Sequence, residues 1–355
     1  MSLQDLLGIE LPIVQAPMAG VQDSALTVAV SNAGGLGSLP CAMLSADAIS
    51  AELTAIKAQT SRPYNVNFFC HRPAQYDEAR ELAWRRTLQP LYAEHGIDPG
   101  SIVAGQGREP FNRAAAELIE EFVPPVVSFH FGLPDDELLA RVVATGAKVL
   151  ASATTVVEAL WLESKGIDAI IAQGLEAGGH RGMFLNPPGT ADVPLVAQLD
   201  SQIGTMALVR QLVQQVSLPV IAAGGIADAA GVAAAIDLGA VGVQVGTAYL
   251  LCPEAKTSNL HRAALSSDAA TSTAITNLFT GRPARAIVNR LMRELGPRHR
   301  NLPDFPLPVA ALAPLRSAAE SLQLADFTPL WCGQNALGCK TVAAAELTRE
   351  LGAAC

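Results

Sequence analysis

The stretch PVIAAGGIADAAGVAAAIDLGAVGVQVGTAYL (Pro219–Leu250) contains two short apolar runs on either side of a helical pattern. The runs, 219–225 and 241–250, are apolar on both faces, as parallel strands covered by helices are. The first ends in Gly224-Gly225 and the second contains Gly246-Thr247. This stretch therefore predicts a strand–helix–strand unit with glycine at the carboxyl end of each strand.

The same alternation of apolar runs and helical patterns covers most of the chain. Six further runs precede this unit, at 12–18, 35–40, 64–69, 126–132, 148–153 and 169–174. Several of the helical segments between them end at glycine, as helices often do. Eight strands alternating with helices are typical of a parallel (β/α)₈ barrel, the TIM barrel, and we predict this α/β fold. An open doubly wound sheet is the alternative, because the sequence does not show the strand order.

Two segments interrupt the alternation, and they predict the domain organisation. Residues 72–110 are a polar helical insertion after the third strand, and 256–320 follow the eighth. In a barrel, both positions lie at the C-terminal face, where the active site of this fold is found. We predict a barrel over 1–255 that carries the ligand site, a smaller helical lid or substrate domain over 256–320, and a helical segment over 321–355 that returns to the barrel.

Composition and charge exclude several classes of function. The 355 residues are 50% hydrophobic and carry a formal net charge of −9, which argues against a nucleic-acid partner. Six cysteines show neither CxxC pairs nor metal-ligand spacing, so we expect free thiols and no metal. No signal peptide and no apolar run of about 18 residues is present. We therefore expect a cytoplasmic protein without a membrane partner.

The two glycine turns also suggest a phosphate site. In (β/α)₈ enzymes, the loops after the seventh and eighth strands commonly bind phosphate through backbone N–H groups. Glycine at Gly224-Gly225 and at Gly246 would let the backbone approach a phosphate and adopt positive φ. Ordinary tight turns are the alternative. Because two such turns occupy both expected positions, we favour the phosphate.

Three amide side chains lie within or at the ends of apolar strands, namely Asn67, Gln173 and Gln244. A buried amide without hydrogen-bond partners costs about 1–3 kcal/mol. Each alone could be a satisfied core amide, but together they favour a polar ligand. A flavin ring, with donors and acceptors along its edge, would match such amides.

The motif AQGLEAGGHRG (172–182) places His180 directly after Gly178-Gly179 at a strand end. Two glycines would let the loop lie beside a planar group, and a histidine there could accept a proton or hold an anionic substrate. A histidine in an exposed loop is the alternative. His130 is the second candidate, and Glu176 is either a carboxylate partner or a helix cap.

The motifs match a known family over most of the chain. They are QAPMAGV (15–21), NVNFFCHRP (65–73), VSFHFG (127–132), AQGLEAGGHRG (172–182), LPVIAAGGIAD (218–228), GVQVGTAYLLCPE (242–254), GRPARAIVNR (281–290) and PLWCGQNA (329–336). In this order they resemble the bacterial class I nitronate monooxygenases, once called 2-nitropropane dioxygenases. The resemblance implies an FMN-bearing TIM barrel that oxidises alkyl nitronates, notably propionate 3-nitronate, with O₂ to a carbonyl compound and nitrite.

The resemblance also implies roles for particular residues. His180 is the expected catalytic residue, holding the nitronate's charge together with backbone N–H groups. Together with the glycine turns, the resemblance predicts cofactor contacts at Pro17, Met18, Asn67, Gln173, Gly178, Gly179, Gly224, Gly225, Gln244, Val245, Gly246 and Thr247. Relatives often line the substrate pocket with tyrosines, whereas this chain has only four tyrosines. That departure leaves the substrate range open.

Two other functions remain compatible with the sequence. An NAD(P)H-dependent flavin reductase, acting on quinones or enoyl thioesters, would share the barrel and its glycine-rich strand ends. A non-catalytic barrel that senses a phosphorylated metabolite is the second alternative. The sequence also leaves a homodimer open.

Overall fold

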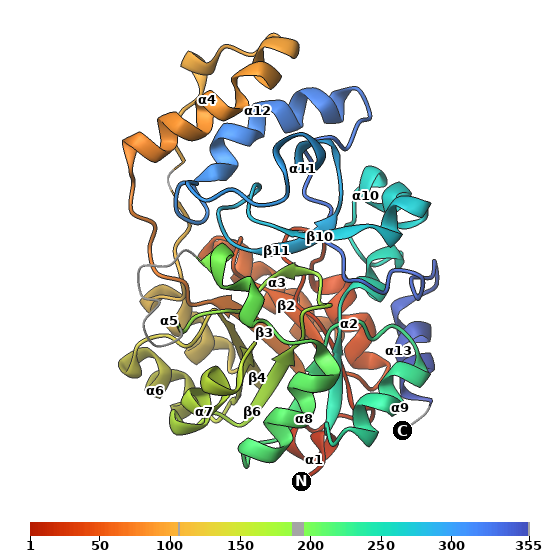
Figure 1. Cartoon of the computed structure of the whole chain (residues 1–355). Coiled ribbons are helices and arrows are strands. Elements are labelled where there is room, and N and C mark those ends of the chain that lie inside the picture. Colours follow the sequence, from red (N-terminus) through yellow and green to blue (C-terminus); the bar gives the residue numbers. More distant parts are fainter. Residues whose placement is uncertain (106, 187–194, 354–355) are drawn as a thin grey trace.

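The computed structural model describes residues 1–105, 107–186 and 195–353, and it contains a closed parallel barrel (Figure 1). The barrel strands are β1 (Ile13–Gln15), β2 (Gly37–Pro40), β3 (Tyr64–Phe69), β4 (Val126–His130), β5 (Lys148–Ala153), β6 (Ala169–Gln173), β8 (Val220–Ala223) and β9 (Gly242–Val245). Their order is β1-β9-β8-β6-β5-β4-β3-β2, and every pair is parallel. A parallel bridge between Val14 and Leu36 closes the ring. The TIM barrel is confirmed, and the open sheet is excluded.

Each barrel strand lies within one of the eight apolar runs in the sequence. The strands β3 and β5 fill their runs, and the other six are shorter because outer residues of the run lie outside the strand. The run 219–225, for example, contains β8 and then Gly224-Gly225. Counted within the barrel, β8 and β9 are the seventh and eighth strands. The two glycine turns therefore lie where the phosphate argument requires them.

Helices surround the barrel, and most begin at a side-chain cap. Asp228, for example, accepts a hydrogen bond from Gly231 N at 2.8 Å and starts α9. C-terminal helix α13 packs against α2 and α9, and so returns to the barrel. The helices of this layer are α1 (Leu3–Leu7), α2 (Ser24–Asn32), α3 (Ala46–Gln59), α5 (Arg113–Phe122), α6 (Asp136–Ala144), α7 (Val156–Ser164), α8 (Thr205–Gln215), α9 (Ala229–Asp237) and α13 (Ala344–Gly352).

Alternation along the strands separates two apolar cores. Ile170 and Val243 belong to the large core between strands and helices, whereas Ile171 and Ile221 belong to a smaller core inside the barrel. Successive side chains of a strand point to opposite faces, so these assignments follow from position alone. The inner core excludes water from the barrel interior and leaves the strand ends free to carry polar groups.

A smaller unit covers the C-terminal end of the barrel, above the strands in Figure 1. It contains α4 (Glu78–Glu94), α10 (Asn259–Leu265), α11 (Arg290–Leu295), α12 (Pro308–Ser321), β10 (Thr273–Thr276) and β11 (Ala284–Ile287). The insertion 72–110 supplies α4, which packs on α12; the Tyr92 hydroxyl donates to the Ala311 carbonyl at 2.6 Å. This unit has its own apolar core, and its exact boundaries remain a prediction.

The sequence suggested a helical unit, but the covering unit also contains strands. Strands β10 and β11 form an antiparallel sheet with β7 (Gly179–His180), a two-residue strand from the loop after β6. The TAIT segment of β10 combines β-branched residues with a short length, a pattern that favours strand over helix. Through β7, this small sheet joins the histidine loop of the barrel to the covering unit.

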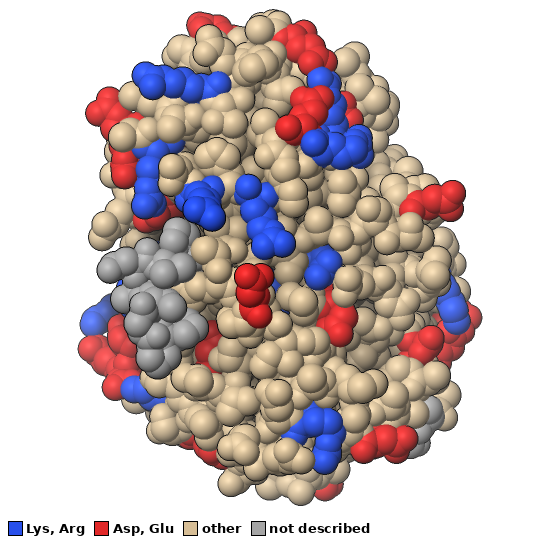
Figure 2. Space-filling model, in the orientation of Figure 1, with Lys and Arg blue, Asp and Glu red and all other residues tan. Residues whose placement is uncertain are grey.

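The surface and the cysteines fit the composition. Acidic and basic side chains are interspersed over the face in Figure 2, without a continuous basic area. Within residues 1–105, 107–186 and 195–353, no helix is both long and apolar enough to cross a membrane. The same residues contain no group of three or more His, Cys, Asp or Glu side chains that could hold a metal ion. The described cysteines are free thiols; Cys355 lies outside the described residues.

Candidate active site

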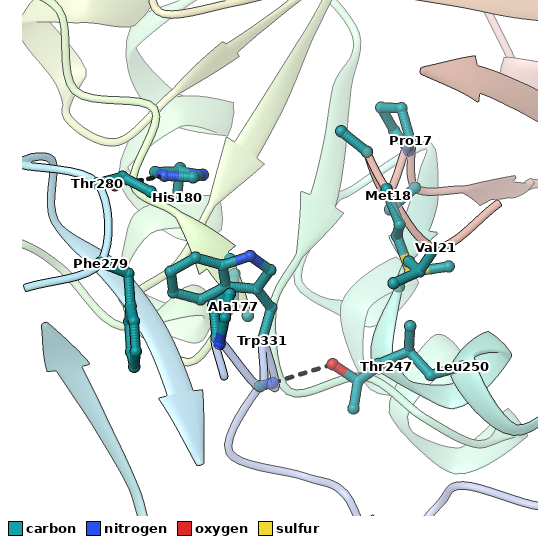
Figure 3. Close-up of a pocket in the computed structure, with 18 of the residues that line it drawn as sticks. Pro17, Met18, Val21, Ala177, His180, Thr247, Leu250, Phe279, Thr280 and Trp331 are labelled. Atoms are coloured by element: carbon teal, nitrogen blue, oxygen red, sulfur yellow. Dashed lines mark hydrogen bonds between the residues drawn. The ribbon is translucent and has the colours of Figure 1, made fainter. Parts of the chain in front are cut away.

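A cavity of about 580 Å³ lies between the strand ends of the barrel and the covering unit. This volume is in the range of sites that enclose small ligands. In Figure 3, His180 and Trp331 face the open space from one side, and Pro17 and Met18 lie on the other. The predicted residues that line the cavity are Pro17, Met18, Asn67, Gln173, Gly178, Gly179, His180, Gly224, Gly225, Gln244, Gly246 and Thr247.

Val245 is the predicted residue that does not line this cavity. Its side chain is 1% exposed and packs in the core between the strands and the helices. Because side chains alternate along β9, Gln244 points to the cavity and Val245 points away from it. The sequence motif runs through both residues and could not separate them.

The polar end of β6 holds the histidine loop in place. Gln173 Nε2 donates to the His180 carbonyl at 2.9 Å, and Gln173 Oε1 accepts from Gly182 N at 2.7 Å. Gly179 has φ +72°, in the left-handed region that favours glycine. The amide of Gln173 is thus satisfied by protein, which is the core-amide alternative for this residue. Its consequence is a fixed backbone at the point where His180 enters the cavity.

The His180 ring lies in an aromatic enclosure rather than in an exposed loop. Its Nε2 is 2.9 Å from Thr280 Oγ1, and its centroid is 5.4 Å from that of Phe305 and 5.2 Å from that of Trp331. Burial lowers the pKa of His180 well below its ordinary value, and the neighbouring His130 and Arg282 lower it further. At neutral pH the imidazole is therefore uncharged and able to accept a proton.

His130, at the end of β4, supports His180. Its Nε2 is 3.2 Å from the His180 carbonyl, and its Nδ1 is 2.6 Å from Ser152 Oγ. A carbonyl oxygen can only accept, so Nε2 carries the proton and Nδ1 accepts from the serine hydroxyl. Burial, with a contribution from Arg282, lowers the pKa of His130 to about 3. Because both ring nitrogens are occupied, His130 helps to fix the loop that carries His180.

The two glycine turns differ in backbone conformation. Gly224 has φ +126° and Gly225 φ +73°, in the region that favours glycine, whereas Gly246 has φ −115°, so the positive φ expected there is not found. A segment near the C-terminus lies against these turns: Asn335 Nδ2 donates to the Gly225 carbonyl at 2.9 Å, and Gly333 N donates to Thr247 Oγ1 at 2.9 Å. The positive φ values explain Gly224 and Gly225 without a ligand. A phosphate at these turns therefore remains a prediction, supported by their place at the cavity wall.

A close approach of another backbone segment explains why Gly178, the first of the two glycines before His180, is a glycine. A Cβ on Gly178 would lie 2.5 Å from Gly333 N and 2.7 Å from the carbonyl carbon of Cys332. Both of those atoms are backbone, so no side chain could move aside. Glycine at this position lets the segment around residue 333 close one side of the cavity.

The remaining amides test whether a cofactor fits. Asn67 Nδ2 donates to Ser128 Oγ at 2.9 Å and to the Ser128 carbonyl at 3.2 Å. Gln244 Oε1 is buried without any hydrogen-bond partner among the described residues. An unpaired buried oxygen of this kind costs about 1–3 kcal/mol, which a donor on a ligand would offset. A flavin ring carries such a donor, so the site fits a flavin.

The covering unit supplies several residues that sequence reasoning missed. These residues lie a hundred or more positions from His180 in the sequence, and several are in loops without periodicity. They are Thr280, Arg282, Phe305 and Trp331. Arg282 Cζ lies 4.0 Å from the centroid of the Phe131 ring, and its guanidinium donates to the Met183 carbonyl. The motif GRPARAIVNR marked Arg282 as part of a resemblance, but nothing in it predicts the direction of the side chain.

Glu176 and the tyrosines resolve two open points. Glu176 accepts hydrogen bonds from Thr205 N at 2.8 Å and Thr205 Oγ1 at 2.7 Å, at the start of α8. It is therefore the helix cap, not a partner of His180.

No tyrosine is found among the described residues that line the cavity. The low number of tyrosines in the sequence is therefore reflected in the described lining of the cavity.

Together these features define a class of protein. A parallel barrel whose strand ends enclose a neutral histidine, glycine turns and an unpaired amide oxygen is a barrel enzyme with a site for small molecules.

The chain belongs to the nitronate monooxygenase family, whose model matches residues 1–353. The nitronate monooxygenase of Pseudomonas aeruginosa is 44% identical over 351 residues, covering 98% of this chain and 96% of that protein. A solved structure of nitroalkane oxidase from Streptomyces ansochromogenes has a TM-score of 0.87 at 36% identity and covers 99% of this chain and 97% of its own. FabK from Thermotoga maritima, with a TM-score of 0.69 at 24% identity over 99% of this chain and 94% of its own, shares the fold alone.

Proposed function

We propose that this flavin-dependent oxidoreductase uses FMN to oxidise alkyl nitronates, with propionate 3-nitronate as the preferred substrate and O₂ as co-substrate. The observation that carries the proposal is the neutral His180 at the wall of a cavity that is also lined by Gln244, whose side-chain oxygen is unpaired among the described residues. Family membership favours this activity over the flavin reductase, and the products would be a carbonyl compound and nitrite.

Specific residues would hold the cofactor. Gln244 would accept a hydrogen bond from the ring, and the turns at Gly224-Gly225 and Gly246-Thr247 would offer backbone N–H groups to the phosphate. Pro17 and Met18 line the same cavity and would contact the ring. When bound, FMN supplies the redox chemistry that links the nitronate to O₂.

The protein's own contribution is a dry and electropositive site for the substrate. If a neutral nitroalkane enters, His180 can remove its α-proton, because its Nδ1 has no partner among the described residues while Nε2 is held by Thr280. The positive charge of Arg282 favours the nitronate anion over its neutral acid. Phe305 and Trp331 exclude water from the region around His180.

A visible spectrum tests the proposal. The purified protein is expected to be yellow and to release FMN on denaturation. Propionate 3-nitronate added without oxygen should reduce the flavin, whereas NADH should leave it oxidised. Reduction by NADH alone would instead support the flavin reductase. A protein that stays colourless after reconstitution with FMN would support the non-catalytic barrel.

Replacing Thr280 with valine is expected to lower kcat/KM for a neutral nitroalkane by about two- to tenfold, the effect of losing one ordinary hydrogen bond. The valine removes the hydroxyl that fixes His180 Nε2 and keeps the branched shape. Initial rates with nitroethane measure the effect. Thr280→Ser restores the hydroxyl and should restore the rate; failure of serine to do so would mean that shape, not the hydrogen bond, matters.

A cytoplasmic location and a homodimer complete the proposal. The net charge of −9 and the free thiols support a reducing compartment. Analytical ultracentrifugation of the purified protein would test the homodimer.

A further inference from the structure

Arg108 stands out among the cationic side chains at the cavity because its guanidinium N–H groups have no acceptor among the described residues. Its guanidinium makes no hydrogen bond or ion pair with any described residue. Arg316 also lines this cavity, and Arg282 lies close enough to His180 to affect its pKa. Both form a hydrogen bond, although the buried Arg282 Nε has none among the described residues. Arg316 Nε pairs with Glu320 Oε1 at 2.7 Å, and Arg282 donates to the Met183 carbonyl. Arg108 therefore has its full donor set available to a ligand.

The Arg108 backbone is fixed even though its side chain is free. His71 Nε2 is 2.9 Å from the Arg108 carbonyl, and Phe111 N donates to the Phe69 carbonyl at 2.8 Å. These bonds attach the segment to the end of β3. The guanidinium is half-buried, and the loss of water lowers its pKa from the ordinary value. A partly desolvated cation on a fixed backbone is a ready site for an anion.

Arg108 lies on the His180 side of the cavity. Its Cζ is 5.9 Å from the centroid of the Phe305 ring, whose other contacts include the His180 ring at 5.4 Å between centroids. Arg108 is also close enough for its charge to contribute to the low pKa of His180. The His180 ring and the Arg108 guanidinium thus contact the same phenyl ring, and both line the cavity.

The cofactor phosphate is an unsuitable partner for Arg108. The phosphate is expected at the turns after β8 and β9, whereas Arg108 lies above the end of β3. In the closed order of the barrel, β2 and β1 separate β3 from β9 on one side, and β4, β5 and β6 separate it from β8 on the other. An anion bound by Arg108 would therefore belong to the substrate rather than to the cofactor.

We propose that Arg108 is a specificity-determining residue that binds a carboxylate at the end of the substrate remote from the nitronate group. A guanidinium can form two parallel hydrogen bonds with a carboxylate, which fixes the orientation of the substrate as well as its affinity. The enzyme would accordingly prefer nitronates that carry a second negative charge. The inference rests on the proposed nitronate oxidation for its kinetic consequence, but binding tests it independently.

Calorimetric titration with two unreactive anions tests the binding. Succinate has the length and both charges of propionate 3-nitronate, because a carboxylate resembles the planar nitronate group; butyrate replaces one charge with a methyl group. The cofactor-loaded protein should bind succinate about ten- to one hundredfold more tightly than butyrate, the range expected for hydrogen bonds between charged groups. Arg108→Gln should abolish this difference, and Arg108→Lys should keep part of it.

Kinetics provide the second readout. The ratio of kcat/KM for propionate 3-nitronate to that for propyl-1-nitronate should fall about ten- to one hundredfold in Arg108→Gln, with most of the loss in KM for the carboxylated substrate. Arg316→Gln removes an equal charge from the same cavity, but one already paired with Glu320, and its ratio should stay near that of the unmodified enzyme.

The outcomes separate this inference from the proposed function. If succinate binding depends on Arg108 but no nitronate is oxidised, the carboxylate site stands and the activity is wrong. If nitronates are oxidised but the succinate preference is absent, or survives in Arg108→Gln, the carboxylate site is wrong. Transfer of the effect to Arg316→Gln would likewise overturn the assignment to Arg108. Near-ultraviolet circular dichroism of each variant shows that the fold is retained.

Discussion

Replacing His180 with asparagine is expected to lower kcat/KM for nitroethane by about 10²- to 10⁴-fold, the usual contribution of a positioned general base. Asparagine preserves a polar side chain of similar width but cannot accept the α-proton. Ethyl nitronate, the same compound already deprotonated, needs no base. Its kcat/KM should fall by no more than about tenfold, through the loss of one hydrogen bond.

The comparison of the two protonation states isolates the role of His180. Both substrates pass through the same cavity, so a general disturbance of the site would lower both rates together. Equal losses with nitroethane and ethyl nitronate would contradict a base at His180. His299→Asn, a histidine outside the cavity, serves as the matched control and should leave both rates unchanged. The flavin spectrum of each variant shows whether the cofactor is retained.

The pH profile gives a second check on the same residue. Because burial and nearby positive charge lower the pKa of His180 well below its ordinary value, the neutral base is present throughout the usual titration range of histidine. The kcat/KM for nitroethane should therefore not fall as the pH is lowered through about 6.5, and should fall only at more acidic pH. A midpoint at the ordinary histidine value would show that His180 is solvated.

The barrel could be predicted because each of its strands is determined by a short segment of the sequence. Each strand is a short apolar run followed by turn residues, and each such run contained one observed strand. The glycines at 224 and 225 were readable for the same reason, since positive φ is a local property. Strand order and closure need long-range pairing, yet eight alternating units leave few alternatives.

The site was predictable in part, and the limit lies in the covering unit. His180 and Gln244 come from a barrel strand or from the loop that follows one, where local motifs mark the mouth of the barrel, although the motif did not separate Gln244 from Val245. Thr280 is one hundred residues from His180, and its partner could be identified only once β11 was seen to pair with β7. Gln173 shows the opposite limit: its position was predicted, but its amide holds the loop through bonds to residues 180 and 182.

Arg181→Met is expected to lower the free energy of unfolding by about 3–5 kcal/mol, because three buried acceptors lose their donor at once. Arg181 is fully buried. It donates to the Gly174 carbonyl at 2.6 Å and the Gln173 carbonyl at 2.8 Å, and twice to Gln202 Oε1, at 2.9 and 3.1 Å. Methionine fills much of the same volume without any donor.

Arg181 also stays charged although it is fully buried. Burial lowers its pKa to about 10, so the side chain remains a cation at neutral pH although no described carboxylate forms an ion pair with it. Carbonyl and amide oxygens alone satisfy it. Chemical unfolding followed by circular dichroism measures the loss, and Arg181→Lys, which keeps the charge but forms fewer bonds, should lie between the methionine variant and the unmodified protein.

A matched control separates this effect from the loss of any arginine. Arg86 is exposed on α4, and Arg86→Met should change the free energy of unfolding by no more than about 0.5 kcal/mol. Two of the three residues bonded to Arg181, Gln173 and Gly174, lie where the chain leaves β6, directly before the histidine loop. The Arg181→Met variant should therefore lose cofactor as well as stability. A variant of unchanged stability would mean that water replaces the guanidinium, and that the loop carrying His180 is held by Gln173 without it.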